Sequence, residues 1–336
     1  MQFFCGFLFD LYDFLCNNAT ISKPMAFQNY PSVCPICKEG KQFLFIRDFQ
    51  EKEHRYSLYQ CLDCQVQFWE PMKNFNSEWY EDNNPYKIRD ILVPKIFRGY
   101  HKSFLKKHNS FSKGTKILDL GCCTGEFLFE LEKRGCQVRG VDSDKEAIRI
   151  AQKYFSLKRV FAMTFEEFFQ KKDLPKFDII TFFEVIQYLD DPLKFIESAK
   201  NLLKPNGTIV LSIPCRDRML VNSSNWDFPH TGSLTRWNTT AVLNLFQKYN
   251  FTIVSVEYLE QFKILSEAFS GKLATGLVNK SIATVGDKKT FIMLPKIIYF
   301  LGRFKYYIVS AVPAFFLWFM GKITKRNNGI MLVELQ

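Results

Sequence analysis

The chain has no apolar run of the length that a bilayer-spanning helix needs, about 20 residues. Its aromatic-rich uncharged stretch near the C-terminus, 306–321, holds 16 residues and is interrupted by Pro313. Residues 1–30 lack the basic start of a secretory signal, and two aspartates interrupt their apolar run. We therefore predict neither a spanning helix nor a signal peptide. Residues 1–30 are interpreted as an N-terminal extension, with Met25 as an alternative start.

Histidine is scarce, and acidic residues are outnumbered by basic ones. The 336 residues include four histidines, and 45 Lys and Arg stand against 34 Asp and Glu, for a net charge of +11. This excess indicates an anionic partner, either nucleic acid or a membrane surface. Hydrophobic residues make up 47% and charged residues 24%, which excludes a disordered chain. The length allows two domains.

The ten cysteines do not have the spacing of a disulfide framework. Cys34 and Cys37 form one Cys-x-x-Cys pair, Cys61 and Cys64 form another, and 23 residues separate the pairs. Two residues between thiolates let both reach one metal ion, and two such knuckles complete a tetrahedral site. The spacing resembles a zinc ribbon over 31–70 in a reduced cytoplasm. Four cysteine ligands close the site, so we expect a structural zinc.

The stretch 116–129 combines a buried strand, a glycine turn and the start of a helix. Gly121 and Gly125 allow a tight turn and the close approach of a ligand to the backbone. A helix that opens near Gly125 offers free N–H groups to an anionic or polar ligand group. A second predicted strand, 137–141, ends in Asp142, where a carboxylate can bind both hydroxyls of a ribose.

This pattern resembles the class I methyltransferases that use S-adenosylmethionine (AdoMet), whose first motif runs acid-x-Gly-x-Gly-x-Gly. The chain reads Asp119-Leu-Gly121-Cys-Cys123-Thr-Gly125. Cys123 replaces the central glycine, and we expect the loop to form because cysteine is small. The resemblance implies that Asp119, Gly121, Cys123, Gly125 and Asp142 hold the cofactor. An NAD-binding unit shares the layout, but the acid inside the first strand and the later blocks favour AdoMet.

Later blocks resemble the same family in the same order. A predicted third strand at 159–162 precedes Thr164 and Phe165, where the family holds adenine. The block 177–192 resembles the fourth strand and its loop, and there the resemblance assigns Phe183 to the cofactor site. Leu-Leu-Lys-Pro-Asn-Gly-Thr-Ile-Val resembles the approach to the fifth strand, with a turn at Lys-Pro-Asn-Gly.

Strands and helices alternate over 116–214, which predicts a parallel, Rossmann-like, doubly wound α/β sheet. A sixth strand is predicted at 252–258, and a last strand at 329–335 should return antiparallel between the fifth and the sixth. The resulting layout is an extension at 1–30, a zinc ribbon at 31–70, a linker and helix at 71–110, and a seven-stranded methyltransferase domain at 111–336 with an insertion at 259–328.

Methyl transfer to a hydroxyl also requires a base. Glu184 and Tyr188 follow the fourth strand, and His230 lies in the long polar loop after the fifth strand. These are the three catalytic candidates. Where the family block has Glu-His, the chain has Gln187 and Tyr188, and where relatives often have a histidine before Leu-Thr-Arg, it has Ser233.

The insertion has a distinctive charge pattern. Segment 288–326 holds eight basic residues and no acidic one around its aromatic run. Such a segment suits peripheral contact with an anionic membrane surface. Packing as a lid over the acceptor site is the alternative interpretation.

The leading functional hypothesis is AdoMet-dependent methyl transfer to a small-molecule or surface-glycan-type acceptor. An RNA methyltransferase is the alternative that the ribbon and the basic charge suggest, but the Asn-Pro-Pro-aromatic block that serves a flipped base is missing after the fourth strand. A third hypothesis is a catalytically inactive binding protein, which the departures at Cys123, Gln187 and Ser233 leave open.

Overall fold

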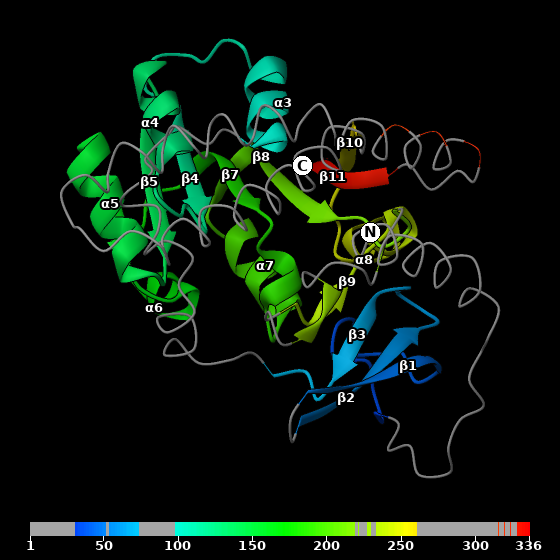
Figure 1. The fold of residues 1–336 in the computed structure, drawn as a ribbon. Helices are drawn as coiled ribbons and strands as arrows, with labels where there is room; N and C mark the ends of the chain where they lie inside the picture. The colour runs from blue at the N-terminus through cyan, green and yellow to red at the C-terminus, as the bar shows by residue number, and fades with distance from the viewer. Residues whose placement is uncertain are drawn as a thin grey trace, which may run out of the picture.

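A seven-stranded sheet forms the centre of the computed structural model, with strand order β10-β11-β8-β7-β4-β5-β6 (Figure 1). The structure describes residues 31–51, 54–73, 98–218, 221, 227–229, 233–260, 315, 319, 323 and 328–336. The strands are β4 (Lys116–Leu120), β5 (Gln137–Asp142), β6 (Val160–Ala162), β7 (Phe177–Phe183), β8 (Leu203–Pro214), β10 (Ile253–Glu260) and β11 (Asn328–Leu335). β4 to β8 are parallel, and β11 runs antiparallel between β8 and β10. The predicted fold class and the place of the last strand are thus confirmed.

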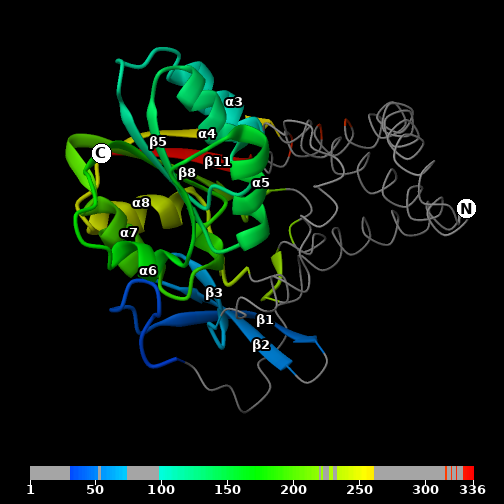
Figure 2. The same cartoon turned by 90° about the vertical axis from the view of Figure 1, so that its left-hand side faces the viewer.

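Helices cover both faces of this sheet, as a doubly wound fold requires. Alternate strand residues point to opposite faces: Ile117 and Ile179 pack with α3, α4 and α5, whereas Leu118 and Ile180 pack with α6, α7 and α8. Figure 2 shows α3 and α4 on one side of the sheet and α7 and α8 on the other. The helices are α3 (Gly99–Lys107), α4 (Glu126–Lys133), α5 (Lys145–Phe155), α6 (Phe165–Phe169), α7 (Pro192–Lys200) and α8 (Thr239–Lys248).

Side chains that accept backbone N–H groups fix where several helices begin. Asp144 caps α5 by accepting two N–H groups at 2.8 and 3.0 Å. Thr164 and Glu167 form a reciprocal capping box at α6. The Asp191 side chain accepts one backbone N–H at the start of α7, and the Asn238 side chain accepts one at the start of α8. Each of these residue types is a strong N-cap, so the sequence itself marks these helix starts.

The turn predicted at 204–207 differs from the structure, because these residues lie within β8. Pairing with β7 jumps from Phe177 opposite Leu203 to Ile179 opposite Thr208. Asn206 lies at φ +62° in the left-handed region. The Pro-Asn-Gly signal therefore produces an irregularity inside the strand, which continues beyond it.

A second sheet has the order β1-β2-β3-β9 and joins the two parts of the chain. Its strands are β1 (Phe43–Glu51), β2 (His54–Cys61), β3 (Gln67–Glu70) and β9 (Thr235–Arg236). β1 and β2 form an antiparallel hairpin between the two cysteine pairs. β9, from the loop after β8, pairs antiparallel with β3. Figure 1 shows β1–β3 beside β9, at the side of the central sheet away from α4 and α5.

Most of the predicted insertion at 259–328 lies outside the described residues, as do residues 1–30. The proposed membrane or lid role of 288–326 therefore stays a prediction. Among the helices that the structure describes, none is both long enough and apolar enough to cross a membrane.

Candidate active site

The loop between β4 and α4 adopts an unusual backbone conformation at three positions. Gly121, Cys123 and Gly125 have φ of +87°, +52° and +79°. The Gly121 N–H donates to the Val141 carbonyl at 2.8 Å, which ties the loop to β5. Added methyl carbons at Gly121 and Gly125 would approach Val185 to 2.5 Å and Leu157 to 2.6 Å. Both glycines are therefore required by backbone conformation and by packing.

Cys123 takes the left-handed conformation that glycine adopts without strain. An L-residue there costs roughly 1–2 kcal/mol, yet the loop closes as the sequence analysis expected. The Cys123 N–H donates to the Asp142 carboxylate at 2.8 Å. This hydrogen bond joins the turn to the acid at the end of β5 and helps to offset the strain.

Asp142 lies at the carboxyl end of β5, where the resemblance places the ribose ligand. Its second oxygen accepts the Asp144 N–H at 2.9 Å. Burial raises the pKa of Asp142 to about 6, against the effect of these backbone hydrogen bonds. Each oxygen keeps a further lone pair, so the carboxylate can accept both hydroxyls of a ribose.

Asp119, in β4 just before the loop, is buried. The Thr181 hydroxyl donates to it at 2.7 Å and links β4 to β7. Burial raises the pKa of Asp119 to about 7, and the Asp142 charge adds to this rise. The predicted part of Asp119 in holding the cofactor stays a prediction.

The three other predicted cofactor residues have different settings. Thr164 is exposed, and its side chain is engaged in the capping box of α6. Phe165 is half-buried and packs edge-on against Phe195, with ring centroids 5.0 Å apart. Phe183 is buried beneath Tyr100, with centroids 5.2 Å apart and nearly parallel rings. The assignment of Thr164, Phe165 and Phe183 to the cofactor site stays a prediction.

Glu184 is the catalytic candidate whose surroundings the structure describes best. It follows β7 with φ +56°, and its N–H donates to the Ser212 carbonyl at 2.9 Å. The Tyr100 hydroxyl donates to its carboxylate at 3.3 Å. Tyr188 is half-buried in the short helix at Ile186–Tyr188. His230 lies outside the described residues.

Sequence reasoning did not identify Tyr100, which lies on α3 and is 84 residues from Glu184. The sequence predicted a helix within 71–110 but not which of its faces contacts the site. A weak signal was present, because Tyr100, Phe104 and His108 recur at the four-residue spacing of one helix face.

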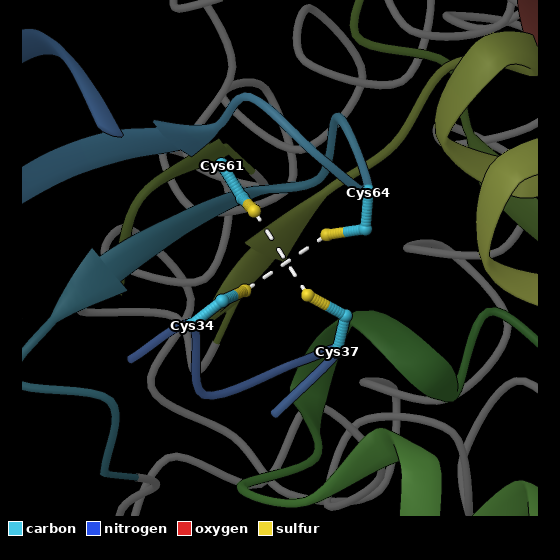
Figure 3. A group of neighbouring side chains, drawn as sticks. All are labelled: Cys34, Cys37, Cys61 and Cys64. Carbon is cyan, nitrogen blue, oxygen red and sulfur yellow. Dashed lines mark hydrogen bonds between the residues drawn. The ribbon is translucent and has the colours of Figure 1, made fainter. Parts of the chain in front are cut away.

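The four predicted metal ligands converge on one point (Figure 3). Cys34 and Cys64 have their Sγ atoms 3.9 Å apart, as do Cys37 and Cys61, and all four sulfurs lie within 4.8 Å of one another. Tetrahedral zinc–sulfur bonds of about 2.3 Å place sulfurs about 3.8 Å apart. The two pairs at 3.9 Å match that spacing, and the four sulfurs are close enough together to hold one zinc ion.

The backbone around the cysteines also suits thiolates. The Ile36 and Gly40 N–H groups donate to Cys34 Sγ and Cys37 Sγ, both at 3.4 Å. A methyl carbon added at Gly40 would lie 2.4 Å from Cys61 Sγ. The glycine therefore keeps the knuckle compact, and the N–H groups stabilise negative charge on sulfur.

The cysteine cluster lies against the catalytic sheet and shares one hydrophobic core with it. The Trp69 N–H donates to the Leu234 carbonyl at 2.9 Å, and the Tyr249 hydroxyl of the catalytic part donates to the Cys37 carbonyl at 3.1 Å. The ribbon is therefore attached to the loop after β8, which borders the carboxyl edge of the central sheet.

Residues 90–256 match the family model described as a methyltransferase domain. The strand order, the antiparallel β11 and the acid-glycine loop agree with that match. The chain therefore carries a methyltransferase domain. Its fold is that of the class I methyltransferases, which use AdoMet.

Curated relatives match part of the chain. The ubiquinone biosynthesis O-methyltransferase of Actinobacillus pleuropneumoniae is 30% identical over 141 residues, which are 40% of this chain and 58% of that protein. Its mitochondrial counterpart from Schizosaccharomyces pombe is 36% identical over 111 residues, 32% of this chain and 40% of that protein. The chain thus spans less than two thirds of the length of these relatives.

A solved structure is similar over most of its length. The AdoMet-dependent methyltransferase of Geobacter sulfurreducens, in complex with S-adenosyl-L-homocysteine, is 16% identical, with a TM-score of 0.46. The comparison covers 78% of this chain and 98% of that one.

We predict that purified protein holds one equivalent of zinc and that Cys61→Ser loses it, because three sulfurs leave the tetrahedral site open. Elemental analysis by mass spectrometry measures this. Cys136→Ser, a buried cysteine outside the cluster, is the matched control and should retain the metal. Metal-free wild type, or full occupancy in Cys61→Ser, would contradict the assignment.

We predict that Asp142→Ala weakens AdoMet binding by roughly 1–3 kcal/mol, because hydrogen bonds to a charged acceptor are lost. In the wild type, affinity should fall as the pH drops through about 6, where the free carboxylate gains a proton. Calorimetric titration at several pH values measures both effects. Glu166→Ala, exposed on α6, should bind as the wild type does. An Asp142→Ala variant with wild-type affinity and pH dependence would exclude the ribose contact.

Proposed function

We propose that the protein is an AdoMet-dependent O-methyltransferase that acts on a hydroxyl of a small-molecule or surface-glycan-type acceptor. The observation that carries the proposal is the position of Glu184, a candidate base, beside the glycine loop. Val185 lies so close to Gly121 that an added methyl carbon would be 2.5 Å from its Cγ2. Curated relatives named O-methyltransferases support oxygen as the accepting atom.

The backbone at Glu184 supports a functional role. A non-glycine residue in the left-handed region is strained, and such strain concentrates at functional sites. The hydrogen bond from Glu184 N–H to Ser212 holds the conformation. The strained turn directs the side chain toward α3, where the Tyr100 hydroxyl meets it.

The electrostatic setting of Glu184 suits a base. Burial raises the pKa of its carboxyl, while the Arg98 charge, the Tyr100 hydrogen bond and the Arg218 charge oppose the rise. Burial also raises the pKa of Tyr100 well above its usual value, so its hydroxyl stays protonated and donates. A base works best when its pKa approaches the working pH. A glutamate whose pKa is raised by burial meets that condition better than an exposed glutamate does.

When bound, AdoMet supplies a methyl group on a positively charged sulfur, which an acceptor oxygen takes as the carbon–sulfur bond breaks. Asp142 and the loop of Gly121 to Gly125 would hold the cofactor. Glu184 would take the proton that the acceptor hydroxyl loses. Zinc held by the four cysteines would be structural, because no ligand position is left open.

For segment 288–326 we infer peripheral contact with an anionic membrane surface, from its charge pattern alone. Eight basic residues beside an aromatic run suit phosphate headgroups. Sedimentation with anionic liposomes tests this inference independently of the catalytic proposal.

The acceptor class is tested by incubating the protein with methyl-tritiated AdoMet and three fractions of a cell extract: small molecules, polysaccharide and RNA. The proposal predicts alkali-stable label in the small-molecule or polysaccharide fraction. Label that ribonuclease releases from the RNA fraction would favour the RNA alternative. Cofactor binding without transfer to any fraction would favour an inactive binding protein.

In the same assay, we predict that Glu184→Gln lowers turnover by about 10²-fold or more, because an amide cannot accept the proton. Cofactor affinity should stay within a factor of about two, since Glu184 is not part of the cofactor loop. Glu132→Gln, an exposed glutamate on α4, is the matched control. Turnover of Glu184→Gln near the wild-type rate would remove Glu184 as the base.

A further inference from the structure

The second cysteine knuckle is held by side chains of the methyltransferase domain as well as by its own sheet. The Asn244 amide, on α8, donates to the Asp63 carbonyl at 3.1 Å. A guanidinium N–H of Arg216, in the loop after β8, donates to the Gln65 carbonyl. Asp63 and Gln65 flank the metal ligand Cys64. The methyltransferase domain therefore contacts the chain on both sides of that ligand.

Arg216 is the residue of this contact that brings a positive charge into the interior. Its side chain is 8% exposed. Its main-chain N–H donates to the Trp237 carbonyl at 2.7 Å, and the preceding residue, Cys215, is fully buried in the same hydrophobic core as the four metal ligands. The backbone thus directs the guanidinium toward the second knuckle and away from water.

The carboxylate that pairs with Arg216 is a weak partner. Asp217 Oδ1 lies 3.8 Å from Arg216 Nε, on a side chain that is 52% exposed, and its other oxygen accepts the Asn238 amide at 3.0 Å. An exposed ion pair contributes about 0–1 kcal/mol, which offsets little of the cost of burying a cation. Burial lowers the pKa of Arg216, and negative charge at Asp217 and at Cys64 is among the causes that oppose this fall.

A zinc-loaded cysteine cluster supplies negative charge at this place. Cysteine binds zinc as the thiolate, so four thiolates carry two more negative charges than one Zn²⁺ neutralises. In a buried site, a nearby cation stabilises such an excess more strongly than it would in water. The metal-free cluster, with protonated thiols, lacks this charge. Arg216 therefore favours the zinc-loaded protein over the metal-free protein.

We infer that Arg216 is a positioning residue of the metal centre, which stabilises the zinc-bound thiolates by its buried charge and fixes the second knuckle through the Gln65 carbonyl. The ribbon provides the four ligands, and the methyltransferase domain provides the compensating charge. Because such a coupling is reciprocal, the loop after β8 helps to retain the metal, and the metal helps to hold the loop. This inference does not depend on the acceptor or on the proposed base.

Competition between the full-length protein and a chromophoric zinc chelator, followed by absorbance, measures the affinity for zinc. Arg216→Gln keeps a hydrogen-bond donor but removes the charge. We expect it to bind zinc about 10–100-fold more weakly than the wild type, the usual effect of losing a group that supports the metal ligands. Arg216→Lys should lie closer to the wild type than to Arg216→Gln, because the charge remains.

Lys248→Gln is the matched control for charge. Lys248 pairs with Glu39, next to the first knuckle, but it is exposed, so water and salt screen its charge. Its loss should change the zinc affinity by no more than about twofold. Wild-type affinity in Arg216→Gln, equal losses in both Arg216 variants, or an equal loss in Lys248→Gln would overturn the inference.

Melting temperatures measured with and without zinc separate a metal-linked role from a structural one. Arg216→Gln should lower the melting temperature of the zinc-loaded protein more than that of the metal-free protein, because weaker zinc binding stabilises the fold less. Equal lowering in both forms, with wild-type zinc affinity, would show that Arg216 is structural.

A labelling experiment on the wild type requires no variant to fold. Phenylglyoxal modifies accessible arginines, and peptide mass spectrometry reads the rate at each one. Arg216 should react faster after the metal is removed by a chelator, whereas Arg149, exposed on α5, should react equally in both forms. An unchanged rate at Arg216 would contradict the coupling between the metal and the loop.

Discussion

The pairing of β3 with β9 is the interaction on which the shape of the loop after β8 depends. β9 is a strand of two residues, Thr235–Arg236, too short to persist alone. Its partner β3 belongs to a sheet that the four cysteines anchor at one end. Trp69 of β3 reaches across with both its main-chain N–H, to Leu234, and its indole N–H, to the Asp227 carbonyl at 3.3 Å. The loop after β8 is therefore shaped by the ribbon as much as by the catalytic sheet.

A buried arginine makes this junction specific. The Arg236 guanidinium lies over the Trp69 ring, 5.0 Å from its centroid, and donates to the Asp227 carbonyl at 3.0 Å. A hydrogen bond from a charged group to a neutral acceptor contributes about 1.5–3 kcal/mol, and a buried donor that loses its acceptor is left unsatisfied. Trp69, Asp227 and Arg236 thus hold one another in place. By contrast, the cofactor loop depends on β4 and β5, which the ribbon does not pair with.

The sequence predicted what local pattern determines and missed what arises from distant pairing. The glycine turn, the acid at Asp142 and the cysteine knuckles each depend on neighbours in the chain, and the structure has the loop and the cysteine cluster where they were expected. β9 was predicted as loop, because two residues carry no periodicity. Tyr100 and Glu184 meet across 84 residues, and Trp69 and Asp227 across 158, so no spacing rule could pair them.

The most direct test of this account is hydrogen exchange of the full-length protein before and after metal removal by a chelator. The account predicts that the amide of Trp69, which donates to the Leu234 carbonyl, loses protection when the metal is removed, because the sheet that holds β9 loosens. The amides of β4 and β5, including Leu120 and Val141, should keep theirs. Unchanged protection at Trp69, or equal loss throughout the central sheet, would contradict the claim that the metal-bound ribbon supports the loop after β8 specifically.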